Sequence, residues 1–178
     1  SKYITTEMAN KVTYDSIQIH GGTGYMKEFP VERLARDARI TNIYEGTSQL
    51  QIVAAIGGVI NDILKDDFDT KAAKSYSGGL DRLNNILIEI REIFYESLKY
   101  VVDKKDSTFQ DVAAKDLVEL YSYIYLGYLV LEEAEDNARK KFIANRYIVT
   151  SLANAKKNAE SIKNELFNDL LHADEILI

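Results

Sequence analysis

The chain has 178 residues, of which 46% are hydrophobic, enough for one buried core or two small ones. A formal net charge of −6 argues against a nucleic-acid-binding protein, which would usually carry a basic patch, and the absence of cysteine excludes disulfides and thiolate zinc sites. No apolar run is long enough to span a bilayer, and the acidic composition favours a cytoplasmic protein.

The first helix is predicted by apolar residues that recur every three or four positions over residues 2–19. They are Ile4, Met8, Val12 and Ile19, and they predict a helix that packs one face against a core. Three glycines in residues 20–28 break this period and predict a loop. Pro30 fits the first turn of another helix, over residues 30–40, because its missing N–H would have no partner there.

Residues 43–51 predict a sharp corner between two helices. Gly46 is poorly suited to a helix interior, while Thr47 or Ser48 can accept hydrogen bonds from the N–H groups of the turn that follows. This arrangement places one carboxylate, that of Glu45, on a short exposed loop beside a helix N-terminus, where an anion can bind. Glu45 is therefore the best candidate for chemistry in the sequence.

Two segments of opposite character follow the corner. Residues 48–64 are apolar on nearly all sides of a helix, which predicts a helix buried on most of its surface. Residues 65–79 are rich in aspartate, serine and glycine, which predicts a linker. We expect a domain boundary there.

Three long amphipathic helices are predicted beyond residue 79. Apolar residues repeat with helical spacing over residues 80–101, the next turn lies at 103–107, and Thr108 is placed to cap the second helix. The third helix is predicted to continue to Leu166. Long helices with short connections favour an antiparallel bundle, and the whole chain, with one proline and no strand pattern, is predicted to be all-α.

The glycine-rich segment Gly21-Gly22-Thr23-Gly24 has two possible readings. It could cradle a phosphate, but it follows a helix where a dinucleotide-binding motif follows a strand, and it lacks the Rossmann spacing. Taken alone, it is best explained as a flexible turn between helices.

Two separated motifs together resemble the C-terminal signature of the acyl-CoA dehydrogenases, flavoenzymes that desaturate acyl-CoA thioesters. One runs from Gln18 to Tyr25 and is followed by Glu28, Arg33 and Asp37; the other is Tyr44-Glu45-Gly46-Thr47-Ser48-Gln49. The resemblance covers residues 2–55. Residues 80–178 resemble, more weakly, the extra C-terminal helical domain of larger family members.

The resemblance implies a domain organisation. Residues 1–65 would be the end of the family's C-terminal helical bundle, 66–79 a linker, and 80–178 a second antiparallel bundle. The chain would then be a fragment of a longer enzyme and inactive alone, because the flavin-holding β-domain and most of the acyl pocket would lie upstream.

The resemblance also implies roles for individual residues. Glu45 would be the catalytic base that removes the α-proton of the thioester, and its backbone N–H would stabilise the enolate together with a flavin ribityl hydroxyl. Tyr44 and Gly46 would line the acyl pocket. The expected contacts to FAD, some made across a subunit interface, come from Gln18, Ile19, His20, Gly21, Gly22, Thr47, Ser48 and Gln49. No metal site is expected.

The implied partners are an acyl-CoA substrate, an electron-transfer flavoprotein and further copies of the chain in a homodimer or homotetramer, in a bacterial cytoplasm. Two alternatives stay open: an acyl-CoA oxidase, and a non-catalytic helical module for dimerisation or membrane docking. Other polar and aromatic residues are expected to be structural. They are His20 at an interface or core, the ion pairs of Arg33, Arg36 and Asp37, and the packed rings of Tyr121, Tyr123, Tyr125 and Tyr128.

Overall fold

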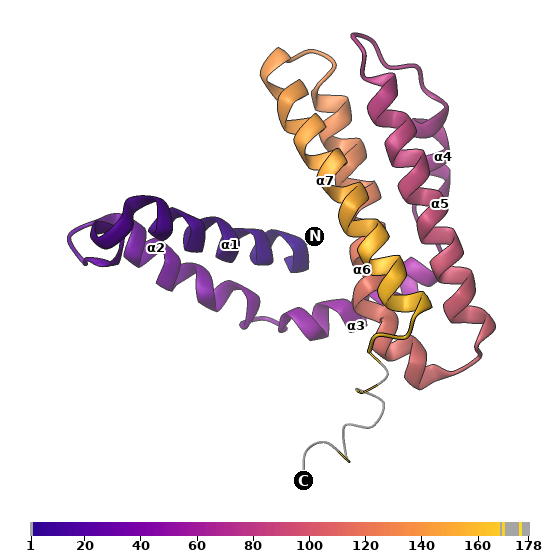
Figure 1. The fold of residues 1–178 in the computed structure, drawn as a ribbon, viewed down its shortest axis with the longest axis horizontal. Helices are drawn as coiled ribbons and strands as arrows, with labels where there is room; N and C mark the ends of the chain where they lie inside the picture. The colour runs from indigo at the N-terminus through magenta and orange to yellow at the C-terminus, as the bar shows by residue number, and fades with distance from the viewer. Residues whose placement is uncertain (1, 168, 170–174, 176–178) are drawn as a thin grey trace. The chain divides into compact units, whose positions relative to one another are not determined.

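The computed structural model describes residues 2–167, 169 and 175, and within these ranges it contains helices and no strands (Figure 1). This confirms the all-α prediction. Internal contacts divide the chain into two compact units, Ser1–Ala54 and Ala55–Ile178. The elements in order are α1 (Lys2–His20), η1 (Gly21–Tyr25), α2 (Pro30–Arg39), η2 (Ile40–Asn42), α3 (Ser48–Ile60), α4 (Lys65–Ala73), α5 (Asp81–Asp103), α6 (Ser107–Glu133) and α7 (Ala138–Lys163).

The first unit is built on a helical hairpin in which α2 returns along α1 (Figure 1). The small core of the hairpin includes Tyr3, Val31 and Ala38. The side chain of Asn10 links the two helices, because its Nδ2 donates to the Ala38 carbonyl at 3.0 Å. The predicted loop after α1 is partly a 3₁₀ helix, η1, so the connection is ordered and compact.

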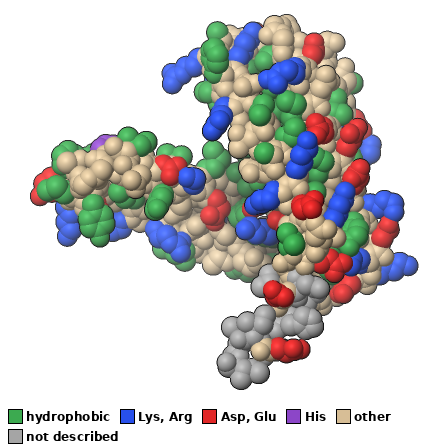
Figure 2. Space-filling model, in the orientation of Figure 1, with side chains coloured by type: hydrophobic (Ala, Val, Ile, Leu, Met, Phe, Trp, Pro, Cys, Tyr) green, Lys and Arg blue, Asp and Glu red, His purple; other side chains and the backbone are tan. Residues whose placement is uncertain are grey.

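The apolar faces predicted to be buried in this unit are largely exposed. On α1, Met8 and Val12 are at least half exposed and Ile19 is 83% exposed; on α3, Leu50 and Val53 are also exposed. Figure 2 shows hydrophobic side chains open on the surface of this unit. The prediction of extensive burial is wrong here, because a unit this small has too few helices to cover every apolar face.

The second unit is a bundle in which α5, α6 and α7 each pack against the other two (Figure 1). This confirms the predicted antiparallel bundle. The N-terminus of α6 differs from the prediction, because Asp106 caps this helix and Thr108 does not. Asp106 Oδ1 accepts hydrogen bonds from the N–H groups of Thr108 at 2.9 Å and of Phe109 at 3.1 Å. The fully buried side chains include Leu87, Ile90, Phe94, Leu117, Leu120, Ile124, Tyr128, Leu131 and Ile148.

The predicted linker over residues 66–79 is replaced by helix α4 and a short, well-packed connection. Phe68 is only 1% exposed, and its ring centroid lies 5.2 Å from that of Tyr121 and 6.0 Å from that of Tyr128. Tyr76 is also buried. The burial of Phe68 and Tyr76 therefore orders this segment in spite of its many polar residues. The packing of Tyr121 and Tyr128 agrees with the structural role expected for them.

A polar network fastens the turn before α4 to the bundle. Asp62 accepts from the hydroxyl of Tyr95 at 2.8 Å and from that of Tyr121 at 3.0 Å. Arg91 donates to the Phe68 carbonyl at 3.1 Å and pairs with Asp69. Burial raises the pKa of both tyrosine hydroxyls, so they remain donors at neutral pH.

We expect Gly127→Ala to destabilise the bundle although alanine is the better helix former. A Cβ at position 127 would lie 2.3 Å from Leu87 Cδ2, and Leu87 is fully buried, so overpacking should cost about 1–3 kcal/mol in urea unfolding. Gly57→Ala in α3 is the control, because its Cβ would meet no atom within 4 Å and should gain about 0.5–1 kcal/mol. Equal gains in both variants would contradict the close helix contact.

Acid should weaken the second unit through Asp69. The pKa of the Asp69 carboxyl lies below its ordinary value of 3.8, because Lys65 donates a hydrogen bond to it and Arg91 donates a second one with a smaller effect. A carboxyl with a lowered folded-state pKa stabilises the fold above its unfolded pKa and loses this contribution as pH falls through the folded value. The urea midpoint should therefore decline below pH 3.8, and Asp69→Asn should flatten that decline while Asp66→Asn, at an exposed position of the same helix, should leave it unchanged.

Candidate active site

The predicted corner is present between η2 and α3. The N–H groups of Ile43 and Tyr44 donate to the Ile40 carbonyl at 3.0 and 3.1 Å, which closes the turn after α2. Thr47 Oγ1 then accepts from the Leu50 N–H at 3.4 Å at the start of α3. Glu45 stands between these two turns on an exposed bend.

The backbone of the corner is left-handed at two successive residues. Glu45 has φ +50° and Gly46 has φ +93°. Glycine adopts this region freely, but a glutamate there costs about 1–2 kcal/mol. Such a conformation persists only where the surroundings hold it, and it is often found at functional sites.

Lys2, at the start of α1, holds the corner. Its ammonium donates to three consecutive carbonyls, those of Tyr44, Glu45 at 3.1 Å and Gly46 at 2.7 Å, and lies 5.1 Å from the centre of the Tyr44 ring. Three ammonium donors thus meet three acceptors. This contact joins residues more than 40 positions apart in the sequence and was not anticipated, because nothing in the local pattern marks Lys2.

Glu7, one and a half turns along α1, forms a second connection. Its Oε1 accepts from Asn42 Nδ2 at 3.1 Å and from the hydroxyl of Ser48. The start of α3 is therefore tied to the same helix as the corner. The Ser48 hydroxyl, expected to contact FAD, donates within the chain, while Thr47 and Gln49 remain exposed.

The glycine segment lies at the other end of α1. Gln18, Ile19 and His20 form its last turn, and Gly21 and Gly22 open η1 with no atom within 4 Å of where a Cβ would be. These five residues are exposed. His20 Nδ1 contacts the Ser16 carbonyl at 2.8 Å, so this ring nitrogen is already engaged.

Gly24 explains why this segment needs glycine. A Cβ there would lie 2.7 Å from the Ile17 carbonyl oxygen and 2.8 Å from His20 Cβ. A glycine at this position lets the 3₁₀ turn close against α1.

The structure does not bring the glycine segment and Glu45 together. Lys2 and His20 are the two ends of a 19-residue helix, which spans about 28 Å at 1.5 Å per residue. Within one copy of the chain, the two groups of expected site residues therefore face separate places. The expectation that the glycine segment serves a site shared between subunits stays a prediction.

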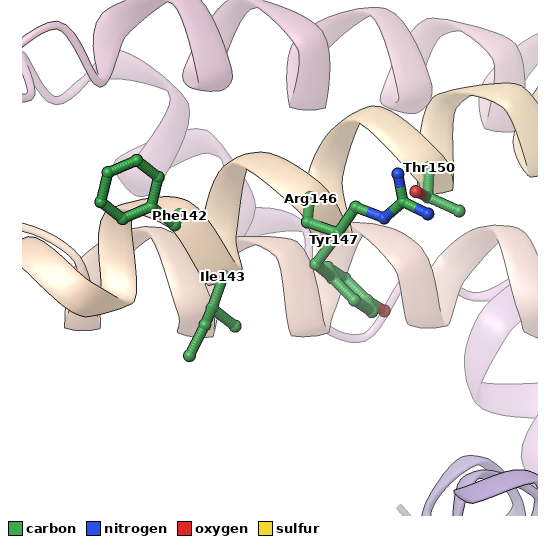
Figure 3. A pocket seen from close by; sticks show the side chains of 5 residues that line it. All are labelled: Phe142, Ile143, Arg146, Tyr147 and Thr150. Atoms are coloured by element: carbon green, nitrogen blue, oxygen red, sulfur yellow. The ribbon is translucent and has the colours of Figure 1, made fainter. Parts of the chain in front are cut away.

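An open hollow on α7 is not part of this candidate site (Figure 3). It has a volume of about 510 Å³ and is lined by Phe142, Ile143, Arg146, Tyr147 and Thr150. None of the residues expected to bind cofactor or substrate contributes to it, and its lining includes no carboxylate that could act as a base. Within the described residues, no cluster of three metal-binding side chains is found and no helix is both long and apolar enough to cross a membrane.

Two family models match the chain in succession. Residues 1–56 match the model described as acyl-CoA dehydrogenase, C-terminal domain, and residues 62–170 match the model described as acyl-CoA dehydrogenase C terminal. The second match alone covers more than half of the 178 residues.

Curated relatives match over a short stretch. An acyl-CoA dehydrogenase of Bacillus subtilis is 53% identical over 51 residues, 29% of this chain and 14% of the relative. The mitochondrial short-chain specific acyl-CoA dehydrogenase of Bos taurus is 48% identical over 60 residues, 34% of this chain and 15% of the relative. The caffeyl-CoA reductase-Etf complex subunit CarC of Acetobacterium woodii is 47% identical over 57 residues, 32% of this chain and 15% of that protein. The matches therefore span only about one-seventh of these relatives.

Two solved structures share the fold. An acyl-CoA dehydrogenase of Bacillus anthracis complexed with FAD superposes with a TM-score of 0.76, at 18% identity, over 90% of this chain and 31% of that one. An acyl-CoA dehydrogenase family protein of Porphyromonas gingivalis gives a TM-score of 0.56, also at 18% identity, over 62% of this chain and 96% of that one. At this identity the likeness establishes the helical architecture.

We expect Gly46→Ala to loosen the corner. Its Cβ would be held at a left-handed φ and would lie 2.8 Å from Gln51 Nε2, so local opening should become easier by about 1–2 kcal/mol. Hydrogen exchange of the Gln51 amide, which donates to the Thr47 carbonyl at 3.0 Å, measures this opening directly. Gly22→Ala, in open space, is the control, and unchanged Gln51 protection in Gly46→Ala would refute the strained corner.

Proposed function

Because the chain belongs to the acyl-CoA dehydrogenase family, we propose that it is the C-terminal part of an FAD-dependent enzyme that introduces an α,β double bond into acyl-CoA thioesters. The single observation that carries the proposal is Glu45, an exposed carboxylate on a left-handed corner between two helices. A strained, solvent-facing base is suited to a reacting group. The chain alone should be inactive, since it spans only about 14% of a relative such as that of Bacillus subtilis.

In this proposal the Glu45 carboxylate removes the α-proton of the thioester. Negative charge then develops on the thioester oxygen, and a preorganised N–H donor lowers the free energy of that state. The Glu45 N–H can serve, because the hydrogen bonds within the described part of the chain leave it without an acceptor. Tyr44 and Gly46, on either side, would contact the acyl chain.

The groups assigned to FAD suit a large polar cofactor. Exposed groups that can hydrogen-bond with it are the side-chain amides of Gln18 and Gln49 and the hydroxyl of Thr47. Close approach of the cofactor is possible at Gly21 and Gly22, where the space beside the backbone is open. Ile19 and His20 would extend this surface, with Ser48 beside it. FAD, when bound, supplies the acceptor for the β-hydride.

The proposed partners follow from the same assignment. The name of the Acetobacterium woodii relative places that protein in a complex with Etf, which supports an electron-transfer flavoprotein as the electron acceptor here. The separation of the glycine segment from Glu45 supports a homodimer or homotetramer, in which two copies complete one site. We place the full-length enzyme in a bacterial cytoplasm, in keeping with the acidic, cysteine-free composition of this chain.

Glu45→Gln in the full-length, FAD-bound enzyme should abolish α-proton abstraction while FAD is retained. General-base catalysis contributes about 10²–10⁴-fold, so turnover should fall by at least about 10². The measurements are substrate-dependent bleaching of the flavin and exchange of the α-proton with deuterated solvent. Glu92→Gln, which neutralises an exposed carboxylate of α5, is the control.

Near-normal turnover in Glu45→Gln would overturn the assignment of the base. Absence of flavin from the wild-type protein would favour a non-catalytic helical module. Peroxide production by the reduced wild-type enzyme would favour an acyl-CoA oxidase.

A further inference from the structure

All the hydrogen bonds from the Lys2 ammonium to the corner go to backbone carbonyls, in addition to its contact with the Tyr44 ring. The three acceptors are the carbonyls of Tyr44, Glu45 and Gly46, which follow one another along the chain. For three consecutive carbonyls to face one cation, the chain must curl around it, and the positive φ angles of Glu45 and Gly46 produce that curl. The strained backbone and the lysine are thus parts of one arrangement.

The carbonyl of Tyr44 belongs to the same peptide unit as the N–H of Glu45. In a trans peptide the two groups point in opposite directions, so the N–H faces away from Lys2. A positive charge on the carbonyl side draws electron density from the nitrogen, and hydrogen bonds in such a chain strengthen one another. The Glu45 N–H is therefore a better donor with Lys2 in place than without it.

We infer that Lys2 is a positioning residue of the catalytic corner, whose ammonium polarises the Tyr44–Glu45 peptide so that the Glu45 N–H stabilises the enolate oxygen of the substrate. This inference rests on the proposed function. No bond to Lys2 forms or breaks: the α-proton moves to the Glu45 carboxylate, and the electron pair it leaves is delocalised onto the thioester oxygen opposite the lysine.

The chemistry of lysine fits this role better than that of arginine. A compact ammonium has three donors that can be directed to three separate acceptors, whereas the guanidinium donors are fixed in a plane. Arginine at position 2 would preserve the charge and lose part of the geometry. A comparison of Lys2→Arg, which keeps the charge, with Lys2→Met, which removes it, therefore separates the electrostatic contribution from mere support of the turn.

The test compares Lys2→Met with Lys2→Arg in the full-length, FAD-bound enzyme. Removing an oxyanion donor outright costs about 10²–10³-fold in kcat, and weakening one should cost about tenfold in kcat with little change in KM. A 3-ketoacyl-CoA binds and ionises to its enolate without being oxidised. At a fixed pH below the midpoint of this ionisation, the enolate fraction bound to Lys2→Met should be about tenfold smaller than that bound to the wild-type enzyme. Lys2→Arg should recover part of both losses.

Lys11→Met is the matched control, because Lys11 is on the same helix and, among the residues that the structure describes, pairs only with Asp15. It should retain the wild-type enolate fraction. If Lys2→Met fails to fold, Lys2→Gln carries the same measurement, since it removes the charge and keeps an amide donor.

A wild-type enolate fraction in folded Lys2→Met, or in its Lys2→Gln substitute, would overturn the inference, even if thermal stability fell, because the lysine would then be only structural. If Glu45→Gln is inactive and Lys2→Met is normal, this inference alone fails. If Glu45→Gln is fully active, the proposed function fails first.

Discussion

The contact between one lysine ammonium and three successive carbonyls determines the shape of the candidate site. It meets the backbone where Glu45 and Gly46 lie in the left-handed region, and it anchors them to the first turn of α1. The side chain of Glu45 stays free for solvent because the corner is held through the backbone. A rigid support around an exposed carboxylate is what general-base catalysis requires, since the base must be held in place before its substrate arrives.

The two units rely on different sources of stability. The second unit buries a continuous set of apolar side chains between three long helices, with buried tyrosines among them. The first has a small core and depends more on polar links, such as those made by Asn10 and Glu7. The residues proposed to act on substrate all lie in the unit with less apolar burial, where loops and helix ends are common, and such positions often carry function.

Local chemistry in the sequence was sufficient to place the corner and the helices other than α4. Gly46 and Thr47 mark the corner directly, and Pro30 marks the start of α2. Helix α4 was missed because aspartates and glycines dominate its surroundings, while the burial that stabilises it depends on Phe68 meeting Tyr121, 53 positions away by their numbers. Lys2 and Asp62 were missed for the same reason: their partners are distant in sequence, and periodicity does not report pairing. The burial of α1 and α3 was overestimated because an apolar face shows that a helix can pack against another element. It does not show that such an element is present.

The network centred on Asp62 couples the turn before α4 to two helices at once. Its two tyrosine partners come from α5 and α6, so either bond alone ties the turn to one helix and the two together tie it to the way those helices pair. Any change that slides α5 along α6 would separate one hydroxyl from the carboxylate. The position of the turn therefore reports on the register of the bundle, although neither tyrosine is altered.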